Sequence, residues 1–160
     1  MGLRTDISND AYHASAELSR SRASALLATS PAHVKYSIDH PSPSTPALLM
    51  GGCFHTAVLE PMKLDYEYGC KPAEIDGKGP LTNHYKAEIE RMEIENPNKR
   101  WLRQSDYDTC MEMAGSALDN LILKDYMSDI DSIIEGTGYF LEEGAECKVR
   151  PDLYLPSAEV

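Results

Sequence analysis

The sequence contains no long apolar run and few cysteines. Nowhere among its 160 residues are there about 18 consecutive apolar residues, the length that a membrane-spanning helix needs. The first ten residues contain no apolar core of the length found in signal peptides. The four cysteines, Cys53, Cys70, Cys110 and Cys147, form no C-x-x-C motif and have no histidine at zinc-finger spacing. Neither a structural zinc site nor a redox motif is therefore indicated, and we expect a soluble cytoplasmic protein with free thiols and no membrane contact.

Positive charge is also scarce. The chain has 15 Lys and Arg against 26 Asp and Glu, which gives a formal net charge of -11 and a pI near 4.8. Nucleic acid repels such a chain at long range, so non-specific DNA binding through a globally basic surface is excluded. The acidic stretches 88–95 and 125–135 indicate either ordinary solvated faces or a surface that mimics DNA or binds metal. A local basic patch is still possible: Arg20, Arg22 and Lys35 lie together near the start, and Lys148 and Arg150 lie together near the end.

The length and the apolar content predict one globular domain over residues 1–160. A chain of this size with 42% hydrophobic residues buries roughly two thirds of its unfolded surface. The first 17 residues indicate an extended arm, and Ser19 and the Ser105-Asp106 pair are the predicted N-caps of two helices. Helices are predicted over residues 18–27, 32–38, 47–60, 81–95 and 105–121, and strands over 64–72, 101–102, 133–135, 139–141, 147–149 and 153–155.

The stretch from Pro46 to Pro61 predicts a helix of three to four turns with a histidine on its apolar face. Pro46 suits the first helical turn, and Pro61 is expected to end the helix because proline cannot continue a helix interior. Apolar and small residues recur around His55 at helical spacing, so its side chain is expected to point inward. Glu60 follows at the helix end. A buried histidine with a carboxylate nearby suits either a structural hydrogen bond or a divalent metal.

The last quarter of the sequence changes to short β-type runs. Residues 142–145 predict a hairpin turn between two of them. Arg150-Pro151-Asp152 then places a carboxylate at a strand junction, where a proline removes no ladder hydrogen bond if it lies at an edge or bulge. Helices followed by an antiparallel ribbon predict an α+β fold, with the N-terminal helices packed on a small antiparallel β ribbon, or the front half of an α/β core.

Four short motifs occur in a fixed order along nearly the whole chain. They are Ile7-Ser8-Asn9-Asp10-x-Tyr12-His13, Leu18-Ser19-x-Ser21, the helix from Gly51 to Pro61, and the strand pair that ends in Arg150-Pro151-Asp152. Together they resemble the PD-(D/E)xK nuclease superfamily, and more closely its exodeoxyribonuclease VIII (RecE-type) branch, which phages and prophages carry. The resemblance implies a PD-(D/E)xK-like α/β core, of which this chain supplies the front half.

The resemblance also implies a function and its site. His55 and Asp152 would line a divalent-metal site, with Glu60 as a further ligand and Mg²⁺, or alternatively Mn²⁺, as the cofactor. Magnesium prefers oxygen ligands and keeps waters, one of which can be activated to attack a phosphodiester. The implied activity is exonucleolytic digestion of linear double-stranded DNA in phage recombination, in the cytoplasm of a bacterial host. A homo-oligomer and a single-strand annealing protein as partner are implied in the same way.

The Asp-x-Lys motif that completes the site in that family does not follow Asp152. Between that residue and the end, Glu159 is the only acid and no lysine occurs. Lys148, on the preceding strand, is a candidate replacement although it is not at the family's lysine position. The chain is therefore expected to be the front part of a longer nuclease, a prophage remnant, or a scaffold kept for another purpose, and whether it is an enzyme stays open. The alternative function is a catalytically inactive acidic interaction protein, acting as a DNA mimic or as an inhibitor of a host nuclease or defence system.

Overall fold

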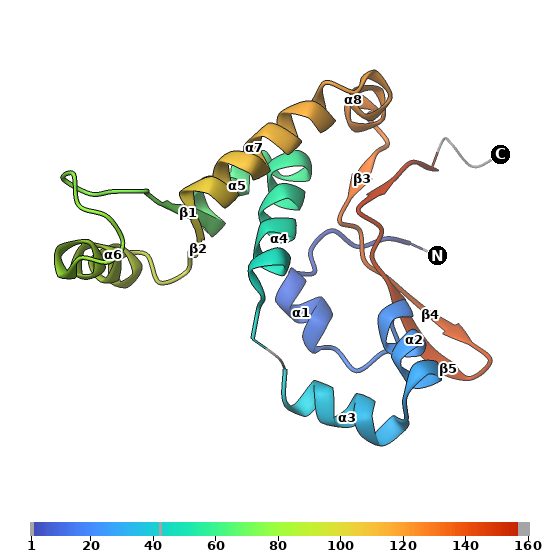
Figure 1. Cartoon of the computed structure of the whole chain (residues 1–160). Coiled ribbons are helices and arrows are strands. Elements are labelled where there is room, and N and C mark those ends of the chain that lie inside the picture. The colour runs from blue at the N-terminus through green and yellow to red at the C-terminus, as the bar shows by residue number, and fades with distance from the viewer. Residues whose placement is uncertain (1, 42, 157–160) are drawn as a thin grey trace. The chain divides into compact units, whose positions relative to one another are not determined.

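The computed structural model describes residues 2–41 and 43–156, so Glu159 lies outside the described residues. Its helices and small sheets give a mixed α+β structure, as predicted (Figure 1). The chain separates into two compact units, the first made of residues 1–43 and 125–160 and the second of residues 44–124. The single domain over 1–160 stays a prediction, and each unit is described by itself. No helix in the described ranges has both the length and the apolar character required to cross a bilayer.

Serine caps define the helices at the start of the first unit. The helices are α1 (Asn9–Ala14), α2 (Arg20–Ala28) and α3 (Pro31–Asp39). Ser8, Ser19 and Ser30 each accept a hydrogen bond at Oγ from a backbone amide three residues later, which satisfies a donor that the helix itself leaves unpaired. The cap predicted at Ser19 is confirmed. The extended arm predicted over residues 1–17 is wrong in part, because Ser8 caps a short helix within it.

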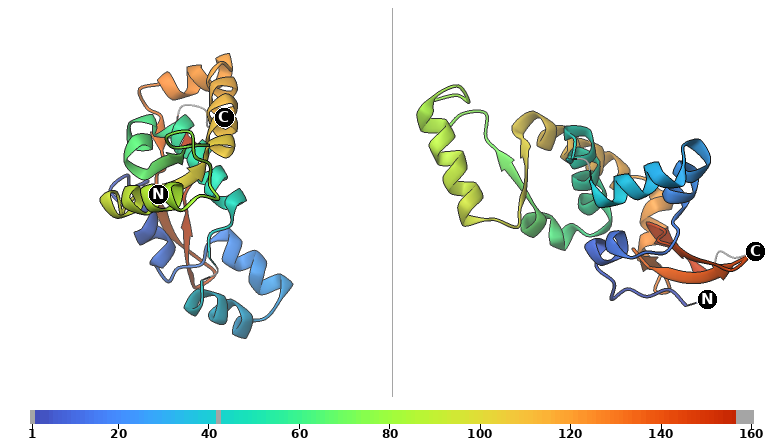
Figure 2. Two further views of the ribbon diagram at one scale, coloured as in Figure 1. Left: turned by 60° about the vertical axis from the view of Figure 1, so that its left-hand side comes forward. Right: turned by 90° about the horizontal axis from the view of Figure 1, so that it is seen from below.

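Two antiparallel strand pairs form the rest of the first unit. They are β3 (Ile133–Ile134) with β6 (Leu153–Tyr154), and β4 (Gly138–Glu142) with β5 (Ala145–Val149). Glu143 and Gly144 join β4 to β5 with φ angles of 49° and 86°. Two central residues with positive φ match the twist of the adjoining strands in a tight hairpin, so the predicted turn over 142–145 is confirmed (Figure 2).

The N-terminal segment is bound to these strands at two points. Arg4 forms an antiparallel bridge with Thr137, in which each amide donates to the other carbonyl at 2.9 and 2.8 Å. Leu18 bridges Cys147 in parallel, with its own amide donating to the Glu146 carbonyl at 2.9 Å. These bridges attach the N-terminal segment to the antiparallel strands on both sides of α1, and the packing of the N-terminal helices on the ribbon stays a prediction.

The second unit is built around a helix pair and a parallel strand pair. Its elements are α4 (Pro46–Leu59), α5 (Pro61–Glu67), β1 (Tyr68–Lys71), α6 (Asn83–Glu95), β2 (Arg100–Arg103) and α7 (Gln104–Leu118), and α8 (Leu121–Ser128) contains the boundary between the units. Helix α4 packs against α7, and β1 pairs in parallel with β2 (Figure 1). Cys53, Tyr68, Leu102 and Cys110 form the buried cluster between these elements.

The strand predicted over residues 64–72 is wrong in its first half. Pro61 begins α5 instead of leading into a strand, because its fixed φ suits the first turn of a new helix. Tyr66 is 67% exposed and Tyr68 only 3%, so these two rings do not lie on one face, as residues two apart in a strand would. Only residues 68–71 are extended, and the parallel partner of this strand was not predicted.

The long helix predicted over residues 105–121 is divided into two helices. Helix α7 begins at Gln104 after Arg103, and neither Ser105 nor Asp106 is its N-cap. The helix ends at Leu118, and the side chain of Asn120 then accepts hydrogen bonds from two amides at the start of α8, at 3.0 and 3.2 Å. An Asx cap inside an otherwise helical pattern therefore starts a new helix.

Candidate functional site

Glu135 and Asp152 lie next to each other, where β3 ends and its antiparallel partner β6 begins. The antiparallel register pairs Ile134 with Leu153, and the Glu135 amide continues the ladder by donating to the Asp152 carbonyl at 3.2 Å. A carboxylate oxygen of one residue lies within 4.8 Å of a carboxylate oxygen of the other. The strand junction predicted for Asp152 is confirmed. Glu135 was predicted as part of a strand and of the acidic stretch 125–135, and its position beside Asp152 was missed because β3 and β6 are distant in sequence.

Arg150 provides the positive charge beside these two carboxylates. Its Nε atom donates to the Glu135 carbonyl at 3.1 Å and lies 3.0 Å from Glu135 Oε2. The Arg150 side chain is 9% exposed and that of Glu135 is 15% exposed, so the ion pair is largely shielded from water. A carboxylate beside a second carboxylate is costly unless a cation is close, and Arg150 supplies that cation from within the same unit.

Lys148 is also buried, but it points to the N-terminal segment. Its Nζ donates to the carbonyls of Tyr12 and Ser15 and lies 2.9 Å from Ser15 Oγ. An ammonium group has three donors, so these three acceptors use its full capacity. Lys148 therefore does not offer a free donor to a catalytic water, and as a replacement for the missing lysine it would first have to leave these partners.

The cations of this region also act on His13. Burial lowers the pKa of this imidazole below its usual range, and the positive charges of Lys148, Arg150 and Arg22 lower it further. Arg22 donates to the carbonyls of His13, Ser15 and Glu17, at 2.6 to 3.0 Å. The N-terminal segment is therefore held by hydrogen bonds from Arg22 and Lys148 to its backbone carbonyls.

His55 and Glu60 belong to the second unit. His55 is half-buried on α4. The residue that this helix contributes to the buried core cluster of the unit is Cys53. Glu60 occupies the junction between α4 and α5, and its carboxylate forms an ion pair with Lys63. Both residues keep the element positions that the sequence indicated, and their predicted roles as metal ligands stay predictions.

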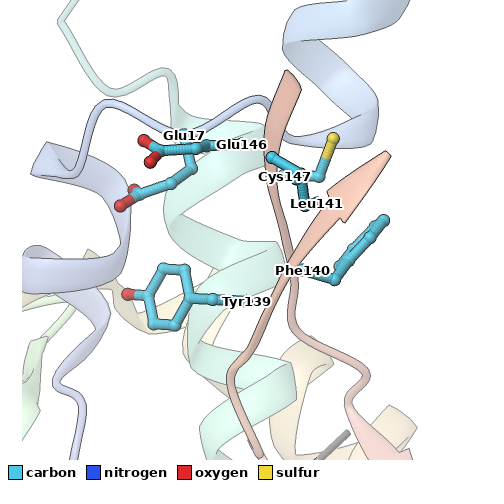
Figure 3. Close-up of a pocket in the computed structure, with 6 residues that line it drawn as sticks. All are labelled: Glu17, Tyr139, Phe140, Leu141, Glu146 and Cys147. Carbon is cyan, nitrogen blue, oxygen red and sulfur yellow. The ribbon is translucent and has the colours of Figure 1, made fainter. Parts of the chain in front are cut away.

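A separate pocket of about 310 Å³ lies along the β4–β5 hairpin in the first unit (Figure 3). Tyr139 and Phe140 point to opposite sides of β4, and the carboxylates of Glu17 and Glu146 lie on the tyrosine side (Figure 3). A hydrogen bond from Ser15 holds the pKa of Glu17 below its usual range, and nearby cations contribute.

No family model, no curated protein and no solved structure matches this chain. The residues described above, together with the motifs of the sequence, are therefore the basis on which its function is proposed.

Proposed function

We propose that this chain carries the metal-binding residues of a Mg²⁺-dependent exodeoxyribonuclease that acts on linear double-stranded DNA. The observation that supports this most directly is the pair of carboxylates formed by Glu135 and Asp152. The order of the sequence motifs, including Arg150-Pro151-Asp152, supports it independently. A PD-(D/E)xK-like core, an annealing protein as partner and a homo-oligomer belong to the same proposal.

The donor set fits a divalent cation. Glu135 and Asp152 offer hard oxygen atoms close enough to be bridged by one ion. On the strength of the sequence resemblance, we propose that His55 adds an imidazole nitrogen to this set. Two carboxylates and one imidazole suit Mn²⁺ as well as Mg²⁺, because manganese accepts nitrogen ligands more readily. A bound ion would activate a water and screen charge on the phosphodiester.

The protein residues have distinct parts in this proposal. Asp152 is exposed, so its carboxylate can accept an ion from solvent, whereas the Glu135 carboxylate is largely buried and held by Arg150. Lys148 is engaged with the N-terminal segment and is not the lysine of the reaction. Metal binding by this chain can therefore be tested separately from DNA hydrolysis.

The first test is a calorimetric titration of the chain with Mn²⁺ at neutral pH. We expect one ion per chain, with binding abolished in Asp152→Asn and weakened by at least tenfold in His55→Gln. Glu60→Gln tests the further ligand that the resemblance implies. Glu142→Gln, which removes an exposed carboxylate at the hairpin, is the matched control and should bind as the unmodified chain does. Equal binding by all variants would reject this site.

The second test is digestion of end-labelled linear duplex DNA with Mg²⁺ or Mn²⁺ and with EDTA. Metal-dependent degradation that disappears in Asp152→Asn is the expected result. If the chain binds Mn²⁺ at this site but cuts no DNA, hydrolysis by this chain is rejected. An acidic interaction protein, which binds a host or phage protein regardless of Asp152→Asn, then becomes the better description.

A further inference from the structure

Arg150 joins separate parts of the first unit. Besides its two contacts with Glu135, it donates from Nη2 to the Ile7 carbonyl at 2.6 Å, and its guanidinium carbon lies 5.3 Å from the centroid of the Tyr12 ring. Its Nη1 atom is buried without a hydrogen-bond partner among the described residues. Burying a cation with one unsatisfied donor is unfavourable, so the other contacts of this side chain must outweigh that cost.

Glu135 has a backbone conformation that few residues other than glycine adopt. Its φ angle is 56°, in the left-handed region, where the Cβ atom approaches the following carbonyl oxygen. Two hydrogen bonds fix this conformation: Arg150 Nε donates to the Glu135 carbonyl, and the Glu135 amide donates to the Asp152 carbonyl. A glycine or asparagine would adopt the same turn more readily, so the glutamate side chain itself is the feature that requires an explanation.

We propose that Arg150 is a positioning residue, which holds Glu135 in this conformation so that its carboxylate lies beside Asp152 and shares a divalent cation with it. The inference rests on the proposed function and adds a residue to it. Arg150 binds both the carbonyl and the carboxylate of Glu135, so it fixes the backbone and the side chain of the same ligand. Such partners of a metal ligand typically change metal affinity by about 10- to 100-fold when they are replaced.

The experiment measures Mn²⁺ affinity by calorimetry in chains that circular dichroism shows to be folded. Arg150→Lys keeps the positive charge but lacks the guanidinium fork, so one ammonium cannot reproduce the contacts with Glu135 and Ile7. We expect it to weaken Mn²⁺ binding by about tenfold or more. Lys148→Met is the matched control, because Lys148 is also a buried cation, but it donates to the carbonyls of Tyr12 and Ser15 in the N-terminal segment. It should bind Mn²⁺ within about twofold of the unmodified chain.

A double-variant cycle separates positioning from general destabilisation. If Arg150 acts through Glu135, the chain with both Arg150→Lys and Glu135→Gln binds Mn²⁺ no more weakly than the Glu135→Gln chain. The positioning role would be overturned if the fold-losses of Mn²⁺ affinity in the two single variants multiply in the double variant. An unchanged Mn²⁺ affinity in Arg150→Lys would overturn it as well. If Arg150→Lys does not fold, Glu135→Asp takes its place, since the shorter side chain draws the carboxylate away from Arg150; unchanged affinity in that variant also overturns the role.

The same titrations distinguish the two proposals. Binding that is lost in Asp152→Asn but unaffected in Arg150→Lys leaves the metal site in place and rejects only the role of Arg150. Absence of Mn²⁺ binding by the unmodified folded chain rejects both.

Discussion

Replacing Lys148 with methionine should loosen the N-terminal segment of the first unit. Methionine keeps most of the apolar length of the side chain but removes the cation that donates to the carbonyls of Tyr12 and Ser15. Lys148 is 4% exposed, so water does not readily replace these hydrogen bonds. Hydrogen bonds from a charged donor each contribute about 1.5–3 kcal/mol. Part of this is offset, because the variant no longer buries a charge, and we expect a net loss of about 3 kcal/mol in the free energy of unfolding.

The loss should be visible both globally and locally. For a chain of this size, about 3 kcal/mol corresponds to a decrease of roughly 6–12 °C in Tm. Hydrogen exchange should accelerate first in residues 9–18, which Lys148 holds. Lys124→Met, at an exposed lysine, is the control and should remain within about 0.5 kcal/mol of the unmodified chain. The reasoning is refuted if Lys148→Met unfolds at the same denaturant concentration as the unmodified chain and hydrogen exchange in residues 9–18 is unchanged. The hydrogen bonds of Lys148 would then contribute nothing to stability.

Three further predictions concern the core, the thiols and pH. Leu102→Ala, at a residue 2% exposed, should lower the free energy of unfolding by about 2–5 kcal/mol in urea titrations, whereas Leu121→Ala, at 80% exposure, should change it by less than about 0.5 kcal/mol. Burial raises the pKa of Cys53 to about 12, so mass-mapped alkylation of the native chain at pH 8 should modify half-buried Cys147 well before Cys53; early labelling of Cys53 would show that the core opens. Because the folded pKa of His13 is lowered, the unfolded chain binds more protons just below the ordinary value of 6.5; stability should therefore rise with pH through that window, and His13→Gln should flatten this slope in thermal melts.

Local signals in the sequence predicted much of the fold. The Ser19 cap depends only on contacts within three residues, and the hairpin turn at Glu143 and Gly144 depends on two adjacent φ angles. Such features depend on neighbouring residues in the sequence, so a local pattern is enough to predict them. Pro61 shows the limit of the same reasoning, because proline ends one helix and suits the first turn of another equally well, and packing of the following residues decided between them.

The candidate site was only partly predictable, for a different reason. Asp152 carries a local signature, a carboxylate after a proline at a strand junction. Glu135 has no such signature: its position depends on the pairing of β3 with β6, and its positive φ is unusual for a glutamate. The burial of Lys148 likewise depends on carbonyls more than 130 residues earlier in the chain. Long-range pairing and cation-to-carbonyl contacts leave no periodicity in the sequence.

The bridges of Arg4 to Thr137 and of Leu18 to Cys147 also determine the order in which the protein can form during synthesis. The second unit consists of one continuous segment, so its contacts become available while translation is still in progress. The N-terminal segment leaves the ribosome before the strands that bind it: Lys148 follows Tyr12 by 136 residues. The nascent chain therefore carries this segment without its strand partners until residues 137–148 are made, and the carboxylate pair forms only after the second unit has been synthesised.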